Sequence, residues 1–251
     1  MTSSSHPKMV SVIIPARDEA SFIGSLIPKV KGSLSGYPYE IIVVDDASRD
    51  RTGDIAQSHG AMVVSHERNL GKGAAMKTGV ENARGDILAF LDSDRAHDPR
   101  DIPGIIAPIV QGKVDFVIGS RAIPGAKVAV APFARRLSND LASFVISVII
   151  SFLLPLATLF RCPFKWVRIT DCTSGFRAIK KESWQKLTLV SQGFQIETEM
   201  IYEAARNKLA IMEVPISCNW NSQVSRLSIA RDGLGTLRLL ARKLMGDIRR
   251  R

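Results

Sequence analysis

The first half of the chain alternates short apolar runs with stretches that have helical spacing. The runs are rich in Val and Ile without polar alternation, which is typical of strands buried on both faces. They lie at 10–14, 40–44, 61–64, 87–91 and 114–118. Pro15 is expected to end the first run, and the stretches between runs predict helices from about Glu19, over 71–83 and over 101–110. The alternation predicts an α/β fold with a mostly parallel sheet and helices on both faces.

After about residue 125 the pattern changes to longer helices and loops. Residues 128–160 are apolar with helical spacing, and 170–177 predict a polar loop. A helix over 194–206 is followed by a short strand at 211–214. We expect one α/β domain.

The C-terminal segment predicts an amphipathic helix over 232–248. The side expected to be apolar consists of Leu234, Leu237, Ala241, Leu244 and Ile248. The positions off that side are Arg238, Arg242 and Lys243. The predicted organisation is therefore a flexible N-terminus over 1–8, a catalytic domain over 9–225 and a basic helix within 226–251.

Composition and charge narrow the class of protein. A chain of 251 residues and 27.5 kDa fits one α/β domain with or without an appendage. Three cysteines without a CxxC pair exclude a disulfide framework and argue against zinc, which indicates a reducing compartment. The net charge is +10, and residues 226–251 carry eight Lys/Arg against two Asp/Glu. Such charge favours a polyanionic partner: nucleic acid, a phosphorylated ligand or an anionic membrane.

Two segments bear on the membrane. Residues 1–7 are polar and the run at 9–14 is too short for a signal peptide, so no secretion signal is expected. Residues 141–160 contain no charge and have the length of a membrane span. The alternative for this stretch is a buried core helix.

Polar residues gather where the predicted parallel strands end, which is where such sheets bind ligands. The clearest of these motifs is Asp92-Ser93-Asp94, which follows the run at 87–91. Its paired carboxylates suit Mg²⁺ or Mn²⁺. The alternative is that the motif forms a solvated turn. Asp46 follows the run at 40–44 and could accept hydrogen bonds from a base or ribose, or else cap a helix.

The remaining candidates are weaker. Residues 69–73 lack both the Walker and the dinucleotide-binding pattern and predict a tight turn into a helix. Arg121 and Arg135 could bind an anion or lie on the surface. Glu197 and Glu199 face different ways on a helix, so one could be functional while the other is solvated.

Several motifs together resemble glycosyltransferase family 2, which has the GT-A fold. They are VSVIIPARDE (10–19), EIIVVDDASRDRT (40–52), NLGKGAAMKTG (69–79), LDSDRAHDP (91–99) and VIGSR (117–121). Three more resemble the polyprenol-phosphate glycosyl synthases, of which dolichol-phosphate mannose synthase is one. These are PFARRLSN (132–139), TDCTSGFRA (170–178) and EVPI (213–216).

The resemblance implies a role for each matching residue. The nucleotide-sugar site would consist of Pro15, Arg17, Glu19, Val44, Asp46, Asp92, Ser93, Asp94 and Arg226. The metal, Mg²⁺ or Mn²⁺, would be held by Asp92 and Asp94. The acceptor site would consist of Arg121, Arg135, Asn139, Ser174, Gly175 and Phe176. The residues expected to be catalytic are Asp94, Arg121 and Arg135.

This sequence departs from the pattern of that family at three positions. Ala96 stands where relatives often have a metal-binding glutamine, and Asn139 stands where they have a serine. In the stretch 221–227 the first arginine of the pattern is missing, which leaves Arg226 as the cation there.

The resemblance implies an inverting transfer of a hexose (mannose, glucose or N-acetylglucosamine) from a nucleotide-diphosphate sugar to a polyprenyl (dolichyl or undecaprenyl) monophosphate. A phosphate monoester is largely dianionic at pH 7, so no catalytic base is required. If residues 141–160 crossed the membrane once, residues 170–216 would lie on the opposite side of it from Asp92. We therefore expect the apolar helices over 128–160 to lie in the membrane interface. The predicted location is the cytoplasmic face of a membrane, peripheral or monotopic, with an anchoring partner or homo-oligomer as further possibilities.

Three alternatives stay open at this point. A family-2 enzyme acting on a hydroxyl acceptor would need a base, and Asp171 or Glu197 would be the candidates. A nucleic-acid-binding module is disfavoured, since aromatics are 6% of the chain and do not interleave with the basic residues. A non-catalytic member that binds partners at the membrane is the third.

Overall fold

A seven-stranded sheet forms the centre of the molecule. The structure, a computed structural model, describes residues 8–94, 96–128, 133–157, 168–219 and 229–249. The strands are β1 (Val10–Ala16), β2 (Tyr39–Asp45), β3 (Met62–Ser65), β4 (Ile87–Phe90), β5 (Phe116–Ser120), β7 (Arg177–Lys180) and β8 (Ile211–Pro215). Their order is β3-β2-β1-β4-β7-β5-β8. β7 is antiparallel to both β4 and β5, and the other pairings in this sheet are parallel.

Each face of the sheet carries its own apolar core. Successive side chains of a strand point to opposite faces. Val12 and Ile14 of β1 therefore pack into one core, whereas Ile13 packs into the other. The first core is covered by α1 (Ala20–Ser33), α2 (Thr52–Ser58), the 3₁₀ turn η1 (Pro99–Asp101) and α4 (Ile102–Val110). The second is covered by α3 (Lys72–Glu81), α7 (Lys181–Trp184) and α8 (Ile196–Arg206).

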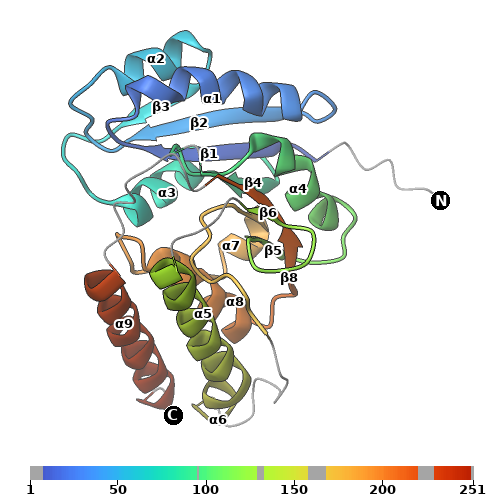
Figure 1. Cartoon of the computed structure of the whole chain (residues 1–251), viewed down its shortest axis with the longest axis vertical. Helices are drawn as coiled ribbons and strands as arrows, with labels where there is room; N and C mark the ends of the chain where they lie inside the picture. Colours follow the sequence, from blue (N-terminus) through green and yellow to red (C-terminus); the bar gives the residue numbers. More distant parts are fainter. Residues whose placement is uncertain (1–7, 95, 129–132, 158–167, 220–228, 250–251) are drawn as a thin grey trace.

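Two long helices extend the second face. α5 (Phe133–Val148) continues through a π-helical turn, η2 (Ile149–Leu153), into α6 (Leu154–Ala157), and α9 (Ile229–Arg249) lies beside it (Figure 1). Pro155 has no N–H for the carbonyl of Ser151, which explains why the helix widens at this point. A short parallel pair, β6 (Lys127–Val128) and β9 (Ser217–Cys218), lies outside the main sheet.

The helix Arg136–Leu156 is long and apolar enough to cross a membrane, and it is the only one of this kind among the described residues. Of its most apolar window, 39% is buried in the protein, which is less than a core helix requires. Its exposed apolar side chains are Leu137, Leu141, Phe144, Phe152, Leu153 and Leu156. This helix is therefore neither a buried core helix nor a fully exposed one.

The structure confirms the α/β fold and corrects several boundaries. Pro15 does not end the first strand, because the parallel pairing with β2 continues to Ala16. The strand expected at 114–118 begins at Phe116, since the Asp115 side chain instead accepts a hydrogen bond from the backbone N–H of Ala210. β7 was not predicted, because its four residues continue directly from the polar loop.

The predicted apolar side of α9 is not the side that packs on the protein. Leu234 and Leu237 are half exposed, whereas Leu239 and Leu240 are buried. Lys243, predicted to lie off the apolar side, points inward and forms ion pairs with α8. Buried charge pairs therefore decide which side of this helix faces the protein.

Gly79 tests how closely α3 packs on the sheet. A Cβ at this position would overlap Ile13 of β1 and press on Val44 of β2. We expect Gly79→Ala to lower the free energy of unfolding by about 1–3 kcal/mol, measured by denaturant titration. Gly104→Ala in α4 is the matched control: nothing lies within 4 Å, so it should leave stability unchanged or raise it by up to about 1 kcal/mol. Equal effects of the two substitutions would contradict the close packing of α3.

Candidate active site

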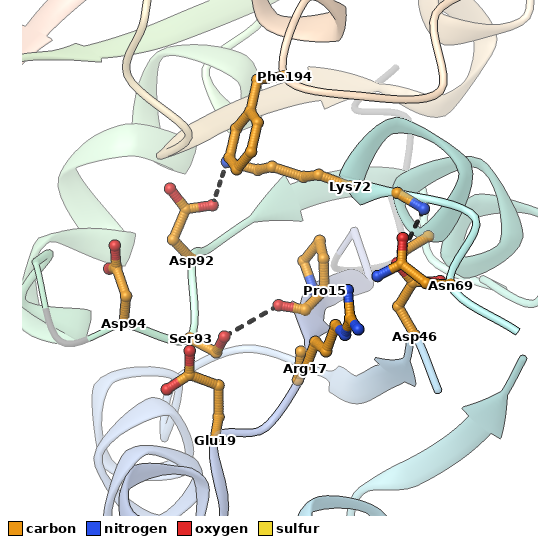
Figure 2. A pocket seen from close by; sticks show the side chains of 13 residues that line it. Pro15, Arg17, Glu19, Asp46, Asn69, Lys72, Asp92, Ser93, Asp94 and Phe194 are labelled. Carbon is orange, nitrogen blue, oxygen red and sulfur yellow. Dashed lines mark hydrogen bonds and ion pairs between the residues drawn. The ribbon is translucent and has the colours of Figure 1, made fainter. Parts of the chain in front are cut away.

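The loops that follow β1, β2 and β4 meet at one edge of the sheet. β1 pairs in parallel with both neighbours, so the three carboxyl ends lie side by side. Together with the start of α3 they form a pocket of about 310 Å³ (Figure 2). It is lined by Pro15, Ala16, Arg17, Glu19, Asp46, Asn69, Gly71, Lys72, Ala75, Asp92, Ser93, Asp94 and Phe194.

Most of the residues predicted for the nucleotide-sugar site line this pocket. They are Pro15, Arg17, Glu19, Asp46, Asp92, Ser93 and Asp94. Ser93 Oγ donates to the carbonyl of Pro15 at 3.1 Å and so ties the loop after β4 to the end of β1. Val44 does not line the pocket, because its side chain is fully buried in the core beneath α3.

Asp46 holds the turn that leads into α3. One oxygen accepts from His66 Nδ1 and from the N–H of Leu70, both at 2.8 Å, and the other accepts from the N–H of Gly71 at 2.8 Å. Asp46 therefore does not cap the helix that follows it in sequence. It positions the 66–71 turn against the pocket.

Lys72 joins two carboxylates at the floor of the pocket. Its Nζ lies 2.5 Å from Asp92 and 2.7 Å from Glu197, and the ring of Phe194 lies 5.6 Å away. Burial would raise the pKa of Asp92, but the charge and hydrogen bond of Lys72, together with other nearby groups that include Arg121, hold that pKa below its usual value. Glu197 is 3% exposed, so it is not the solvated residue that the sequence allowed.

Asp94 differs from Asp92 in its surroundings. No cationic side chain of the described residues forms an ion pair with it, and its Oδ1 accepts from the N–H of Ala96 at 3.0 Å. Burial, and then the negative charge of Asp92, raise the pKa of Asp94. A cation bound beside the two carboxylates would relieve both effects.

The two aspartates fit a divalent cation shared with a ligand. Among the described residues no group of three or more His, Cys, Asp or Glu could hold a metal ion. The protein would therefore supply only a few of the cation's ligands, as in Mg²⁺ sites where phosphate oxygens supply the others. His97 follows Ala96 in the sequence. Burial lowers the pKa of His97 to about 4, so its imidazole is neutral. Its Nδ1 has no hydrogen-bond partner.

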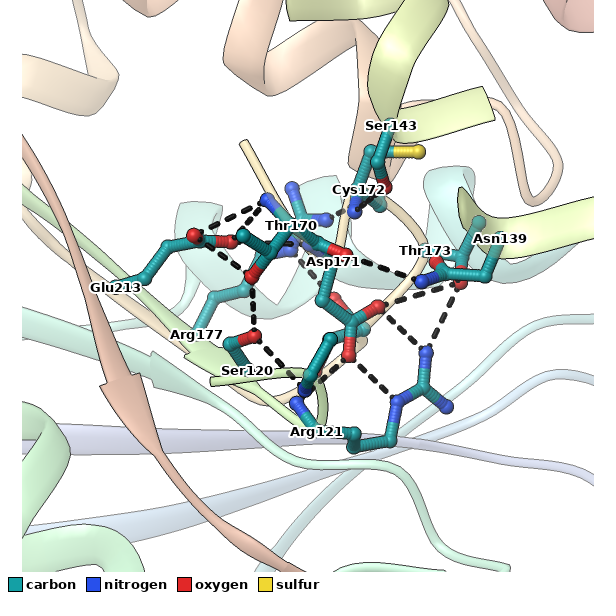
Figure 3. A network of polar contacts seen from close by, with 12 residues as sticks. Ser120, Arg121, Asn139, Ser143, Thr170, Asp171, Cys172, Thr173, Arg177 and Glu213 are labelled. Atoms are coloured by element: carbon teal, nitrogen blue, oxygen red, sulfur yellow. Dashed lines mark hydrogen bonds and ion pairs between the residues drawn. The ribbon is translucent and has the colours of Figure 1, made fainter. Parts of the chain in front are cut away.

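Figure 3 shows a second charged cluster, around Arg121 and Asp171. The charge of Arg121 also acts on Asp92 and helps to lower the pKa of that carboxyl. Arg121 binds Asp171 through Nε at 2.6 Å and Nη2 at 2.7 Å, and donates to Thr173 Oγ1 at 3.0 Å. Asp171 is 0% exposed; burial would raise its pKa, but Arg121 lowers it. Asn139 of α5 joins this cluster, since its Nδ2 donates to the carbonyl of Thr170.

The loop that carries this cluster is fixed at its base. Glu213 of β8 accepts from the backbone N–H of Thr170 and of Asp171 at 2.9 and 3.0 Å. Arg177, fully buried, donates to the carbonyls of Ser174, Cys172 and Glu197. Polar groups of the protein therefore position the whole loop over 170–177.

The predicted acceptor residues on this loop have different surroundings. A Cβ on Gly175 would overlap the carboxylate of Asp92, so only glycine lets the loop reach the pocket. Ser174 is fully buried and its Oγ has no hydrogen-bond partner. Phe176 belongs to the core and packs on the ring of His97 at 5.5 Å, so it does not face an acceptor.

The roles predicted for two residues are not tested. Arg226 lies outside the described residues. Arg135 lies in α5, but its side chain is outside the described part of the structure.

The sequence analysis did not single out Lys72 or Phe194. Lys72 stands in the turn 69–73, which was predicted to lead into a helix near the nucleotide, with no role given to the lysine itself. Phe194 is at least a hundred positions from every other lining residue. The spatial distance between either side chain and Asp92 cannot be read from the sequence.

Comparison with known proteins identifies the family. The family model described as glycosyl transferase family 2 matches residues 11–188. The dolichol-phosphate mannosyltransferase of Pyrococcus furiosus is 34% identical over 212 residues, 83% of this chain and 56% of that protein. The chain thus spans little more than half the length of that relative. The UDP-N-acetylglucosamine–dolichyl-phosphate N-acetylglucosaminyltransferase of Methanococcus voltae is 29% identical over 83% of this chain and 85% of that protein.

Solved structures confirm the GT-A-like fold. The glucosyl-3-phosphoglycerate synthase of Mycobacterium tuberculosis matches with a TM-score of 0.68 at 23% identity, over 93% of this chain and 80% of that one. Its complex with Mn²⁺, uridine diphosphate and glucosyl-3-phosphoglycerate matches with a TM-score of 0.64 at 22% identity, over 96% and 78%.

Metal addition tests the fit of Asp92 and Asp94. With a nucleoside diphosphate present, saturating Mn²⁺ should raise the midpoint of thermal unfolding, because a ligand at a hundredfold excess over Kd stabilises by about 2.7 kcal/mol. Asp94→Asn should lose most of this shift. Without metal the variant should be at least as stable as the wild type, since it removes the repulsion from Asp92.

Asp54→Asn, at a side chain that is 73% exposed on α2, is the charge-matched control and should keep the full shift. A metal-induced shift that survives in Asp94→Asn would place the cation elsewhere.

Proposed function

The chain belongs to glycosyltransferase family 2, and we propose that it transfers a hexose from a nucleoside-diphosphate sugar to a polyprenyl monophosphate. One observation carries this proposal: the loop whose Gly175 reaches Asp92 in the pocket also carries Asp171, which holds the guanidinium of Arg121. The relatives from P. furiosus and M. voltae, whose names specify dolichol or dolichyl phosphate, support the acceptor.

In the proposed donor site, different pocket residues bind different parts of the nucleotide sugar. The nucleotide would lie between Pro15, Arg17 and Asn69, and the diphosphate would approach Asp92 and Asp94. A bound divalent cation would supply positive charge to the leaving diphosphate. Lys72 holds Asp92 in place and adds a second positive charge at the floor.

The proposed acceptor site rests on the orientation of Arg121. Asp171 and Thr173 together fix the guanidinium, so its position is set before a substrate arrives. A fixed cation can attract the acceptor phosphate and align its oxygen with the sugar carbon without reorganisation. The phosphate oxygen attacks as a dianion, and the nucleoside diphosphate leaves from the opposite side of that carbon.

The electrostatics favour a phosphate acceptor over a hydroxyl acceptor. A hydroxyl would need a general base, and Asp171 and Glu197 were the candidates from the sequence. Arg121 holds the pKa of Asp171 below its usual range, which makes it a weak base. Glu197 is paired with Lys72 at 2.7 Å. A phosphate nucleophile requires neither of them.

We further propose that the outer sides of α5, α6 and α9 lie on an anionic membrane surface, on its cytoplasmic face. Leu141 and Phe144 are 62% and 59% exposed. On α9, exposed Leu237 alternates with exposed Arg238 and Arg242, a mixture that suits lipid tails and headgroups together. The close approach of Gly175 to Asp92 supports a peripheral or monotopic arrangement, because a single crossing by α5 would separate them.

The reaction is tested with a donor panel. Purified protein is incubated with polyprenyl monophosphate, Mn²⁺ or Mg²⁺, and radiolabelled GDP-mannose, UDP-glucose or UDP-N-acetylglucosamine in turn. One donor is expected to give label that partitions into organic solvent. Asp94→Ala should reduce the rate by a factor on the order of 100 or more, because charge stabilisation of the leaving group is lost.

Asp54→Ala on the exposed surface of α2 should keep the wild-type rate. If no donor labels the lipid while nucleoside diphosphates still bind, the polyprenyl acceptor is wrong.

The proposed membrane-binding surface of the protein is tested by introducing one charged side chain into it. Phe144→Asp should weaken co-sedimentation with anionic vesicles by roughly 10- to 100-fold, since burying a Phe in an apolar phase is worth about 1.5–3 kcal/mol. Val110→Asp, at the end of α4 and far from α5, is the matched control and should bind as the wild type does (Figure 1). Equal binding of the two variants would argue against this surface.

A further inference from the structure

The inner side of α9 holds a set of buried ion pairs with α8. Lys243 Nζ lies 3.0 Å from Glu199 Oε1 and 2.6 Å from Glu203 Oε1. One turn later, Asp247 accepts from Tyr202 Oη and from Arg206 Nε, both at 2.7 Å. Glu199 and Glu203 are almost completely buried, so their negative charges must be balanced where they lie.

The same carboxylates hold a loop, over 188–195, that precedes α8. Glu199 accepts from the backbone N–H of Val190 at 3.0 Å and of Ser191 at 2.9 Å. Lys243 itself donates to the carbonyl of Thr188 at 2.7 Å. The loop therefore depends on a charge pair in which one partner comes from α9.

This loop in turn covers the beginning of α3. The N–H of Ala74 donates to the carbonyl of Gln192 at 3.1 Å. A Cβ on Gly71 or Gly73 would lie 2.6 Å or 2.7 Å from carbonyl oxygens of the loop, so the two backbones are in direct contact. Lys77 Nζ approaches the carbonyl of Leu189 at 3.4 Å.

The loop ends at the proposed donor site. Phe194 lines the pocket and lies over Lys72, which bridges Asp92 and Glu197. Glu197 stands two residues before Glu199 on α8. A continuous series of contacts thus runs from Lys243 through Glu199 and the loop to the pocket wall.

We propose that Lys243 is a positioning residue for the donor site, acting through Glu199 and the 188–195 loop. Without its ammonium, two buried carboxylates four positions apart on α8 repel each other. That repulsion is relieved when Glu199 releases the amides of Val190 and Ser191, which frees Phe194 from its place over Lys72. The proposal rests on the proposed donor site and is independent of the acceptor.

The test compares Lys243 with an exposed lysine outside α9. Binding of UDP and GDP in the presence of Mn²⁺ is measured by calorimetry for the wild type, Lys243→Met, Lys243→Arg and Lys113→Met, with no acceptor present. Lys243→Met should weaken nucleoside-diphosphate binding about tenfold. Lys243→Arg should keep most of it, and Lys113→Met, on the exposed surface after α4, should match the wild type.

Hydrogen exchange supplies the readout that a loss of global stability would not give. The backbone amides of Val190 and Ser191 should exchange faster in Lys243→Met, while those of β1 stay protected as in the wild type. In turnover assays the KM for the donor should rise and the KM for the acceptor should not.

A double substitution keeps the test decisive if Lys243→Met folds poorly. Lys243→Met combined with Glu199→Gln removes both charges of the pair and retains an oxygen for one of the two loop amides, so donor binding should recover in part toward the wild-type value. Equal nucleotide binding by Lys243→Met and the wild type, or no recovery in the double variant, would overturn the role of Lys243. A wild type that binds neither nucleotide would instead overturn the proposed donor site, and this inference with it.

Discussion

The charge of Asp92 has to be balanced at a position that is only partly exposed, and this constraint organises the site. The residue is placed by the end of a buried strand, and Lys72 neutralises it from the first turn of α3. Lys72 also reaches Glu197, so α8 is drawn to the same point. Gly175 lets a further loop approach the same carboxylate closely. Elements far apart in the sequence therefore meet around one negative charge, and Asp94 beside it has no ion-pair partner among the described residues.

The second buried pair, Arg121 with Asp171, gives the site its chemical bias. Because Asp92, Glu197 and Asp171 are each matched with a cation, these carboxylates are poorly suited to removing protons. This arrangement fits a nucleophile that is already ionised. It also explains why the loop over 170–177 is so heavily hydrogen-bonded: a buried guanidinium–carboxylate pair is stable only when its remaining polar atoms are satisfied.

Each of the long helices on the second face of the sheet has one side that contacts the protein and one side that faces outward. α9 presents Lys243 and Asp247 to α8 on one side, and Leu237 with Arg238 and Arg242 to the outside. α5 likewise carries Asn139 toward the arginine cluster and Phe144 outward. The proposed lipid surface and the proposed catalytic site are thus opposite sides of the same elements, and the inner contacts of α9 extend to the donor pocket.

The α/β class, the strand ends and the placement of Asp92, Asp94 and Asp46 at one edge could all be predicted from the sequence, because buried parallel strands have a local signature and their carboxyl ends must coincide. Which charges pair with one another depends on the three-dimensional fold. That Lys72 belongs to Asp92, Arg121 to Asp171 and Lys243 to Glu199 depends on distances across the fold, which hydrophobic periodicity does not encode. For the same reason Val44 and Phe176, predicted to touch ligands, lie in the core, and Lys243 faces inward although its neighbours on α9 suggested the opposite.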